Sequence, residues 1–269
     1  MIAIPNRELR RLGVGIACLL LAASAMGGPV VHSVLVTVPA GRFESVLPPA
    51  AGIKQVSVAP FRIDSVPVSN ADFARFIDHS PQWRRDRIPR VFADTQYLRH
   101  WESSTAPDET MRNQPVTRIS WFAASAYCEA RGARLPTWYE WEYVAAASET
   151  QTDARKDAAW RQRILDWYST SGRGPLPDVG RGVANAYGVR DLHGVVWEWV
   201  EDQAGMLVSG DNRQQGDPDT MRFCGSGAIT MEQKENYATL MRIAMLSSVQ
   251  ASYTTANMGF RCAADLVAR

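Results

Sequence analysis

The 269-residue sequence predicts a mixed α/β fold in a single domain, and three observations support this. Residues 34–38 and 54–63 contain alternating or clustered apolar residues, a pattern that is typical of strands. Between residues 70 and 167, several stretches place apolar residues at helical spacing. Beyond residue 185, aromatic and β-branched residues at short intervals favour short strands, and no repeat or linker marks a second domain.

Capping residues indicate where the helices begin. Thr137 and Glu140 form a capping-box signature, in which each residue satisfies a free backbone N–H of the other. Residues 81–114 have no sustained period, so they are expected to form a long ordered loop of the kind that often shapes a binding surface. The expected helices cover residues 71–77 with Asn70 as N-cap, the stretch from Ser120 to Gly132, residues 138–147 and residues 152–167.

Composition excludes one class of partner. With 46% hydrophobic residues and nine Trp, the chain can bury an ample core. Its 29 Lys and Arg residues nearly balance 28 Asp and Glu residues, and no long basic run is interleaved with aromatic residues. The sequence therefore predicts no nucleic-acid partner.

Residues 1–25 have the features of a signal peptide. Arg7, Arg10 and Arg11 precede an apolar run over residues 12–22, and small residues follow at 23–25. Because this run is shorter than the roughly 20 residues that cross a bilayer, we expect cleavage rather than a membrane anchor. The mature domain would then cover residues 26–269, would have no membrane span, and would be periplasmic or secreted.

The mature chain would keep three cysteines, Cys128, Cys224 and Cys262. In an oxidising compartment an odd number implies one disulfide and one remaining thiol, or an intermolecular pair. The cysteine count alone leaves the pairing open.

Residues 191–198 contain a possible calcium loop. Asp191 and Glu198 could supply carboxylate oxygens, and the carbonyl groups of Gly194 and Val196 lie between them in the sequence. Such hard oxygen donors suit calcium better than zinc or copper. The alternative is a strand in which the neighbouring tryptophans are buried on one face while Glu198 is solvated on the other.

An ordered series of motifs extends over nearly the whole mature chain. The motifs are Pro115-Val-Thr-Arg-Ile-Ser-Trp121, Gly132-Ala-Arg-Leu-Pro-Thr137, Glu140-Trp-Glu142, Trp197-Glu-Trp199 and Gly259-Phe-Arg-Cys262. With these motifs the chain resembles the formylglycine-generating enzyme, or sulfatase-modifying factor, family from Phe61 to Asp265. The resemblance implies an α/β domain related to C-type lectins, with much irregular backbone. It also implies a disulfide between Cys128 and Cys262, and calcium at Asp191, Gly194, Val196 and Glu198.

The catalytic part of the resemblance fails. Active family members oxidise a substrate cysteine with oxygen and use two cysteines that bind copper(I). Counting back from Gly259, with Arg242 as an anchor, these positions are Ala238 and Ile243, and neither side chain can bind copper. Cys224 is a single thiol and cannot replace a pair. A relocated copper site with His193, Met241 or Met245 remains an alternative that the spacing does not require.

The resemblance therefore implies an exported, catalytically inactive member that binds an envelope protein or peptide as a regulatory component. The chain is similar to exported relatives that promote threonine-phosphorylation control of type VI secretion. A role in such envelope signalling is therefore one specific form of this hypothesis. The alternatives are an oxidase or maturation enzyme for an exported substrate, and a calcium-dependent lectin-like binder. Candidate partner contacts are Trp83, Arg99 and Trp101, unless these aromatic residues cover the core.

Overall fold

The computed structural model describes residues 33–47, 53, 55–170, 174–203 and 237–266. Its strands form three small sheets, and together with the helices they confirm the mixed α/β class. Antiparallel strands β1 (Leu35–Val38), β4 (Phe61–Asp64) and β7 (Ala263–Asp265) form the largest sheet, in the order β1-β4-β7. Strands β2 (Gly41–Glu44) and β3 (Gln55–Val58) pair antiparallel, and β5 (Trp197–Glu198) pairs parallel with β6 (Met258–Gly259).

The three-stranded sheet brings the two ends of the described chain together. In its register Val38 lies opposite Phe61, and Ile63 of the central strand lies opposite Ala263 near the C-terminus. All four of these side chains are buried. The sheet therefore joins the first and last strands through a shared apolar face.

The first helix begins one residue earlier than the sequence predicts. Helix α1 covers Asn70–His79, and its N-cap is Ser69, whose Oγ accepts from the Asp72 backbone N–H at 3.1 Å. Asn70 lies inside the helix, and its Nδ2 donates to the Met111 carbonyl at 2.9 Å. The prediction of Asn70 as N-cap was therefore wrong, because this buried amide holds the following loop instead.

Two further helix starts are as predicted. Helix α2 (Trp121–Ala130) begins after Ser120, whose Oγ accepts from the Ala123 N–H at 3.2 Å. Helix α3 (Trp138–Ala145) begins with both hydrogen bonds of the Thr137–Glu140 capping box. In the predicted loop the described residues form only the short 3₁₀ helices η1 (Pro81–Trp83) and η2 (Glu109–Met111).

The last two helices depart from the predictions. Helix α4 covers Ala158–Thr170 and so begins six residues later than expected, because Asp157 Oδ1 accepts from the Ala159 N–H at 2.8 Å and sets the start. Helix α5 (Tyr237–Ser247) occupies a region where we expected strands. Its Ala, Leu, Met and Arg residues favour a helix, and this propensity outweighs the short apolar spacing.

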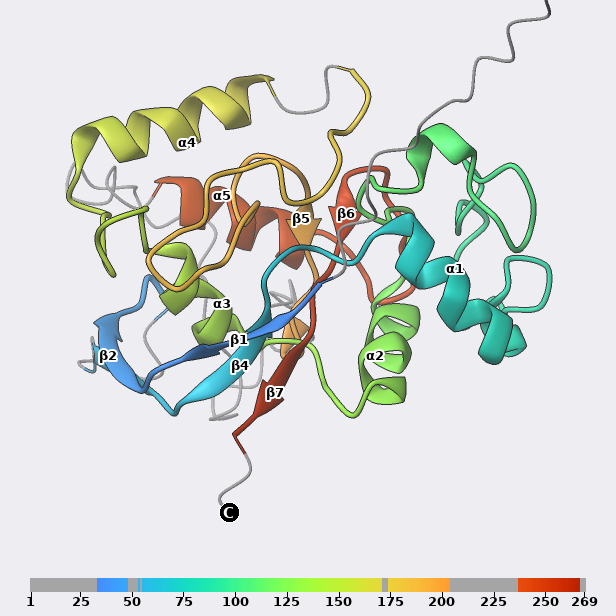
Figure 1. The fold of residues 1–269 in the computed structure, drawn as a ribbon, viewed down its shortest axis with the longest axis horizontal. Helices are drawn as coiled ribbons and strands as arrows, with labels where there is room; N and C mark the ends of the chain where they lie inside the picture. Colours follow the sequence, from blue (N-terminus) through green and yellow to red (C-terminus); the bar gives the residue numbers. More distant parts are fainter. Residues whose placement is uncertain (1–32, 48–52, 54, 171–173, 204–236, 267–269) are drawn as a thin grey trace, which may run out of the picture.

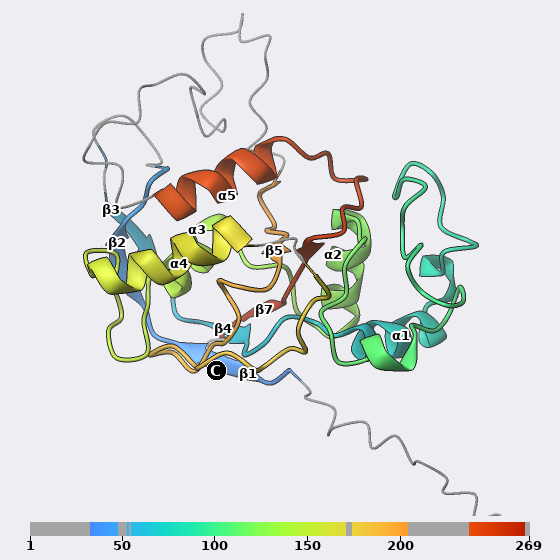
Figure 2. The ribbon, with the colours of Figure 1, turned by 90° about the horizontal axis from the view of Figure 1, so that it is seen from above.

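The helices gather at two ends of the molecule. Helices α4 and α5 lie side by side above α3 at one end (Figures 1 and 2). Helices α1 and α2 and the long loop that follows α1 form the other end. No helix among the described residues is long and apolar enough to cross a membrane.

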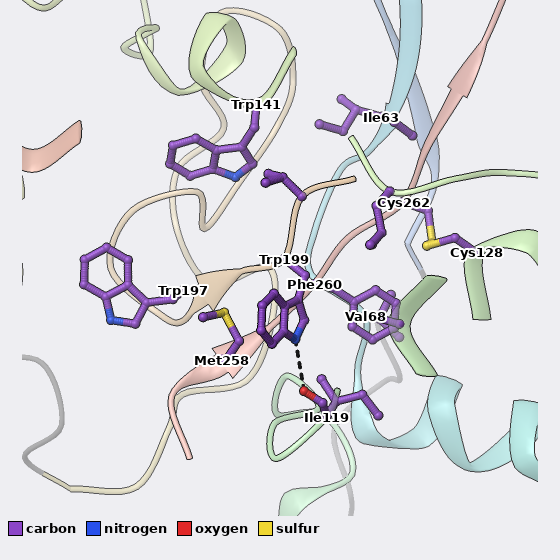
Figure 3. Packing of buried hydrophobic residues seen from close by; sticks show 14 of the residues in the cluster. Ile63, Val68, Ile119, Cys128, Trp141, Trp197, Trp199, Met258, Phe260 and Cys262 are labelled. Atoms are coloured by element: carbon purple, nitrogen blue, oxygen red, sulfur yellow. Dashed lines mark hydrogen bonds between the residues drawn. A yellow bond between two sulfur atoms is a disulfide. The ribbon is translucent and has the colours of Figure 1, made fainter. Parts of the chain in front are cut away.

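Large aromatic side chains and one disulfide connect these parts at the centre. Trp199 is 1% exposed, and its Nε1 donates to the Ile119 carbonyl at 3.0 Å (Figure 3). Cys128 of α2 is bonded to Cys262 with a Cα–Cα distance of 5.5 Å, and both residues are fully buried. The bridge therefore fastens α2 to the segment that enters β7.

Glu142 on α3 anchors the chain that leaves β2. Its two carboxylate oxygens accept from the Ser45 hydroxyl and from the Val46 N–H. Burial raises the pKa of Glu142 to about 7, although these two bonds and the charge of Arg155 act in the opposite direction. This carboxyl therefore titrates near neutral pH in the folded protein.

The Glu142 pKa predicts a dependence of stability on pH. Because the folded pKa is raised above the unfolded value, the folded state binds more protons between about pH 4.5 and 7. The contribution of Glu142 to stability is complete below that window and is lost as the pH rises through about 7. Glu142→Gln should flatten the profile of melting temperature between pH 5 and 8. An unchanged slope in this variant would assign the titration to another group.

Candidate functional site

A buried ion pair joins β5 to the C-terminal segment. Glu198 and Arg261 are both 0% exposed, and Arg261 Nη2 lies 2.7 Å from Glu198 Oε1. Arg261 Nε lies 2.9 Å from the other carboxylate oxygen, Oε2, which also accepts from Trp141 Nε1 at 2.8 Å. Arg261 also donates to the carbonyl groups of Asp64 and Arg190, each at 3.0 Å. The carboxylate is thus neutralised and hydrogen-bonded within the core.

A second buried cation lies beside this pair. Arg242 of α5 is 1% exposed, and its guanidinium carbon lies 3.5 Å from the centroid of the Trp141 ring. It donates to the Glu198 carbonyl, so α5 is held against β5 through this side chain. Burial lowers the pKa of Arg242 to about 10, and the nearby Glu198 charge partly offsets this effect. Arg242 therefore remains protonated at neutral pH.

A cavity of about 310 Å³ lies next to this core. One face of α4 forms a wall through Trp160, Ile164 and Trp167, which are spaced at helical intervals. Asp191 and His193 line the cavity from the segment that precedes β5. Its size is at the lower limit for small-molecule sites, so the cavity could hold a compact ligand or a single side chain.

His193 is the polar lining residue with the most perturbed environment. Its Nε2 lies 2.9 Å from the Ala145 carbonyl, and its ring meets Trp141 and Trp160 edge to face at 5.8 and 5.7 Å. Burial lowers the pKa of His193 to about 4, so the ring is neutral at pH 7. The carbonyl requires a proton on Nε2, which leaves Nδ1 as an acceptor that is enclosed without a partner among the described residues.

Two further polar side chains of the cavity have partners within the protein. Ser148 Oγ accepts from two backbone N–H groups, at Thr150 and Gln151, and Glu149 pairs with Arg163 at 3.0 Å. Ser148 and Glu149 therefore already have hydrogen-bond or ion-pair partners within the protein.

The two carboxylates among the predicted calcium ligands are held by other partners in this geometry. Asp191 has a positive φ of 60°, and its carboxylate accepts from the N–H groups of Gly180 and Gly182, the latter at 3.0 Å. Glu198 faces Arg261 instead, so the two carboxylates serve different partners. Gly194 lies against Trp167, and Val196 is buried beside Gly259. A divalent cation would have to displace the buried guanidinium from Glu198.

Ala238 and Ile243 stand at the two positions that the resemblance assigns to the copper-binding cysteines, and neither suits that ion. Both lie in α5, and Ile243 is an apolar side chain that is fully buried in the core. Ala238 carries no donor atom. Among the described residues, no three His, Cys, Asp or Glu side chains converge on one point. Cys224 lies outside the described residues.

The candidate partner contacts in the long loop have different environments. Trp101 is 3% exposed, and its Nε1 donates to Asn70 Oδ1 at 2.8 Å, so this residue covers the core, as in the alternative to a partner contact. Trp83 is half-buried and packs against Phe92, while Arg99 is exposed. The buried hydrogen-bond partner of Trp101 could not be inferred from the loop sequence.

Sequence reasoning also missed the roles of His193 and Arg242. The sequence indicates His193 only as a possible copper ligand, and Arg242 only as an anchor for locating the copper positions. A histidine within an aromatic run is the only local signal for the cavity. Nothing local indicates that Arg242 stacks on Trp141, because the two residues are about 100 positions apart in the sequence.

Comparisons with known proteins agree with the motif series. The family model of the sulfatase-modifying factor enzyme 1-like domain matches residues 28–266. The chain is 28% identical over 273 residues to the bovine (Bos taurus) inactive C-alpha-formylglycine-generating enzyme 2, covering 85% of this chain and 87% of the relative. It is 27% identical over 267 residues to the bovine formylglycine-generating enzyme, covering 80% and 68%.

A relative whose name describes a different enzyme matches over fewer residues. Hercynine oxygenase of Mycolicibacterium smegmatis is 33% identical over 166 residues, which cover 54% of this chain and 38% of that protein. Among solved structures, PvdO from Pseudomonas aeruginosa aligns with a TM-score of 0.48 and 18% identity, over 86% of this chain and 94% of PvdO. The family model covers nearly all of the chain, and the chain therefore belongs to the sulfatase-modifying factor, or formylglycine-generating enzyme, family.

Proposed function

We propose that this protein is an exported, catalytically inactive family member that acts as a binding and regulatory component in the bacterial envelope. The observation that carries the proposal is the fully buried Ile243 at one expected copper position, with Ala238 at the other. Without sulfur at either position the family's dithiolate copper site cannot form there. A relative whose name describes it as inactive matches over most of both chains, which supports the same conclusion.

Features of the sequence support the proposed location and partner. Residues 1–25 resemble a signal peptide, which supports export, and the near balance of charges argues against a nucleic-acid partner. An envelope protein or peptide is the proposed partner. The version in which this partner belongs to type VI secretion signalling rests on the resemblance to exported relatives.

An anaerobic copper(I) titration of the purified mature protein tests the proposal. We expect no tight copper binding, and no loss of the thiol from a cysteine-containing peptide incubated with the protein and oxygen. The matched variant is Cys224→Ser, which identifies any weak binding by that single thiol. Tight binding together with peptide oxidation would overturn the proposal, and its loss in Cys224→Ser would assign the activity to that thiol. An active formylglycine-generating enzyme serves as the positive control.

The second candidate function is an oxidase or maturation enzyme for an exported protein or peptide. The match to hercynine oxygenase favours it, because the name of that relative describes an oxygenase among the proteins with a similar sequence. The cavity beneath α4 would then be the place for a reacting group. The same copper and peptide experiment decides between the two functions.

A further inference from the structure

The loop that contains Val91 and Phe92 and the loop that contains Tyr253 hydrogen-bond to each other, and both carry exposed apolar side chains. We name the surface of these two loops the loop face and define it by Arg87, Arg90, Val91, Phe92 and Tyr253. Val91 is 69% exposed, Phe92 37% and Tyr253 41%. Three of the eight exposed large apolar side chains in the described ranges therefore lie on these two hydrogen-bonded loops, and exposed apolar side chains that gather in this way favour an interaction site.

Hydrogen bonds hold the two loops together. The Asp94 N–H donates to the Ser252 carbonyl at 2.9 Å, and the Asp94 carboxylate accepts from the N–H of Thr254 at 3.2 Å. Within the first loop, Arg85 Nη1 donates to the carbonyl of Leu98 at 2.9 Å. The loop face is thus built before any partner arrives, which lowers the entropic cost of binding.

Phe92 is the exposed end of a row of aromatic rings. Its ring centroid lies 5.9 Å from that of Trp83 and 5.3 Å from that of Phe122. Phe122 in turn meets Trp121 edge to face at 5.5 Å. Phe92 is therefore supported from beneath, as is typical of side chains that dominate binding energy at interfaces.

The charged residues of the loop face are basic. Arg87 and Arg90 are exposed, and among the described residues neither forms an ion pair. The nearest carboxylate in the sequence, Asp86, pairs with Arg84 at 2.9 Å. Exposed Arg99 lies on the same loop. Exposed apolar side chains and unpaired guanidinium groups on the same loop are complementary to an acidic partner that also carries an apolar side chain.

We infer that the loop face binds an acidic segment of a partner protein, with an apolar side chain of that segment against Phe92 and Tyr253. Carboxylates of the segment lie against Arg87 and Arg90. The two arginines would repel a basic partner. The exposed apolar side chains favour a partner segment that carries an apolar residue as well as negative charge. The inference rests on the proposed binding function and gives the partner a chemical class.

Fluorescence anisotropy with a labelled peptide of two Glu, one Phe and two Glu residues tests the inference on the full mature protein. We expect saturable binding that weakens about tenfold in the double variant Arg87→Glu, Arg90→Glu, and by a similar factor in Phe92→Ser. The matched control is Arg42→Glu, an exposed arginine on β2, which should leave the affinity unchanged. If the double variant does not fold, Arg90→Gln provides the smaller change.

Two control peptides separate the contributions. Replacing Phe by Ser in the peptide should weaken binding about tenfold, and replacing Glu by Lys should abolish it. Absence of saturable binding, equal binding of the Lys peptide, or an equal loss in Arg42→Glu would overturn the inference. Because the copper titration does not involve this surface, failure of the loop face and failure of the inactive assignment are distinguishable.

Discussion

Glu198→Gln should lower the free energy of unfolding by about 3 to 5 kcal/mol, because it leaves the Arg261 guanidinium charged and unpaired in the core. Both side chains are 0% exposed, so solvent cannot screen the remaining charge. The amide nitrogen of Gln would also face N–H donors of Arg261 or Trp141, where the carboxylate accepts from both. Urea denaturation followed by tryptophan fluorescence measures the loss.

The same experiment tests the role of calcium at this position. Since Glu198 is neutralised by Arg261, we expect equal destabilisation in calcium and in chelator. The matched control is Glu149→Gln, which removes an ion pair with exposed Arg163 and should change stability by less than about 1 kcal/mol. A loss confined to calcium-containing buffer would show that an ion, rather than Arg261, balances Glu198.

Removing the disulfide should have an effect of similar size. Cys128 and Cys262 are 134 residues apart, so their bond restricts the unfolded chain strongly. We expect the double variant Cys128→Ala, Cys262→Ala to lose about 4 to 5 kcal/mol on the loop-entropy model. Urea denaturation of the oxidised wild type and of the variant measures the difference.

Peptide mapping without reductant provides the control for that experiment. It should recover Cys128 linked to Cys262, with Cys224 open to alkylation after unfolding. Cys224→Ser should keep the stability of the wild type, since the bridge does not involve it. A peptide in which Cys224 is linked to either partner would contradict this assignment.

Local features of the fold could be predicted where one short segment contains all the interacting groups. The Thr137–Glu140 capping box and the Ser120 cap form as predicted, because each joins atoms within three residues. The prediction of strands at α5 was wrong, since its apolar spacing also suits short strands. The prediction of Asn70 as N-cap was wrong because its long-range role leaves no local signal.

The candidate site shows the same division. The sequence identified the segment from Asp191 to Glu198 but not the partners of its carboxylates. Strand alternation places Glu198 on the face opposite Trp197 and Trp199. The alternative to a calcium loop predicted that this face is exposed to solvent. In the structure both faces are buried, because the C-terminal segment brings Arg261 to the second one.

The sequence by itself determined the family, the class of fold and the lack of sulfur at residues 238 and 243, because these depend on which residues are present and in what order. Only the tertiary structure decided that Glu198 is held by Arg261, that Trp101 is buried and that Phe92 is exposed. These outcomes depend on contacts between segments far apart in the chain. A buried charge such as that of Glu198 is stable only when another segment supplies a partner of opposite charge.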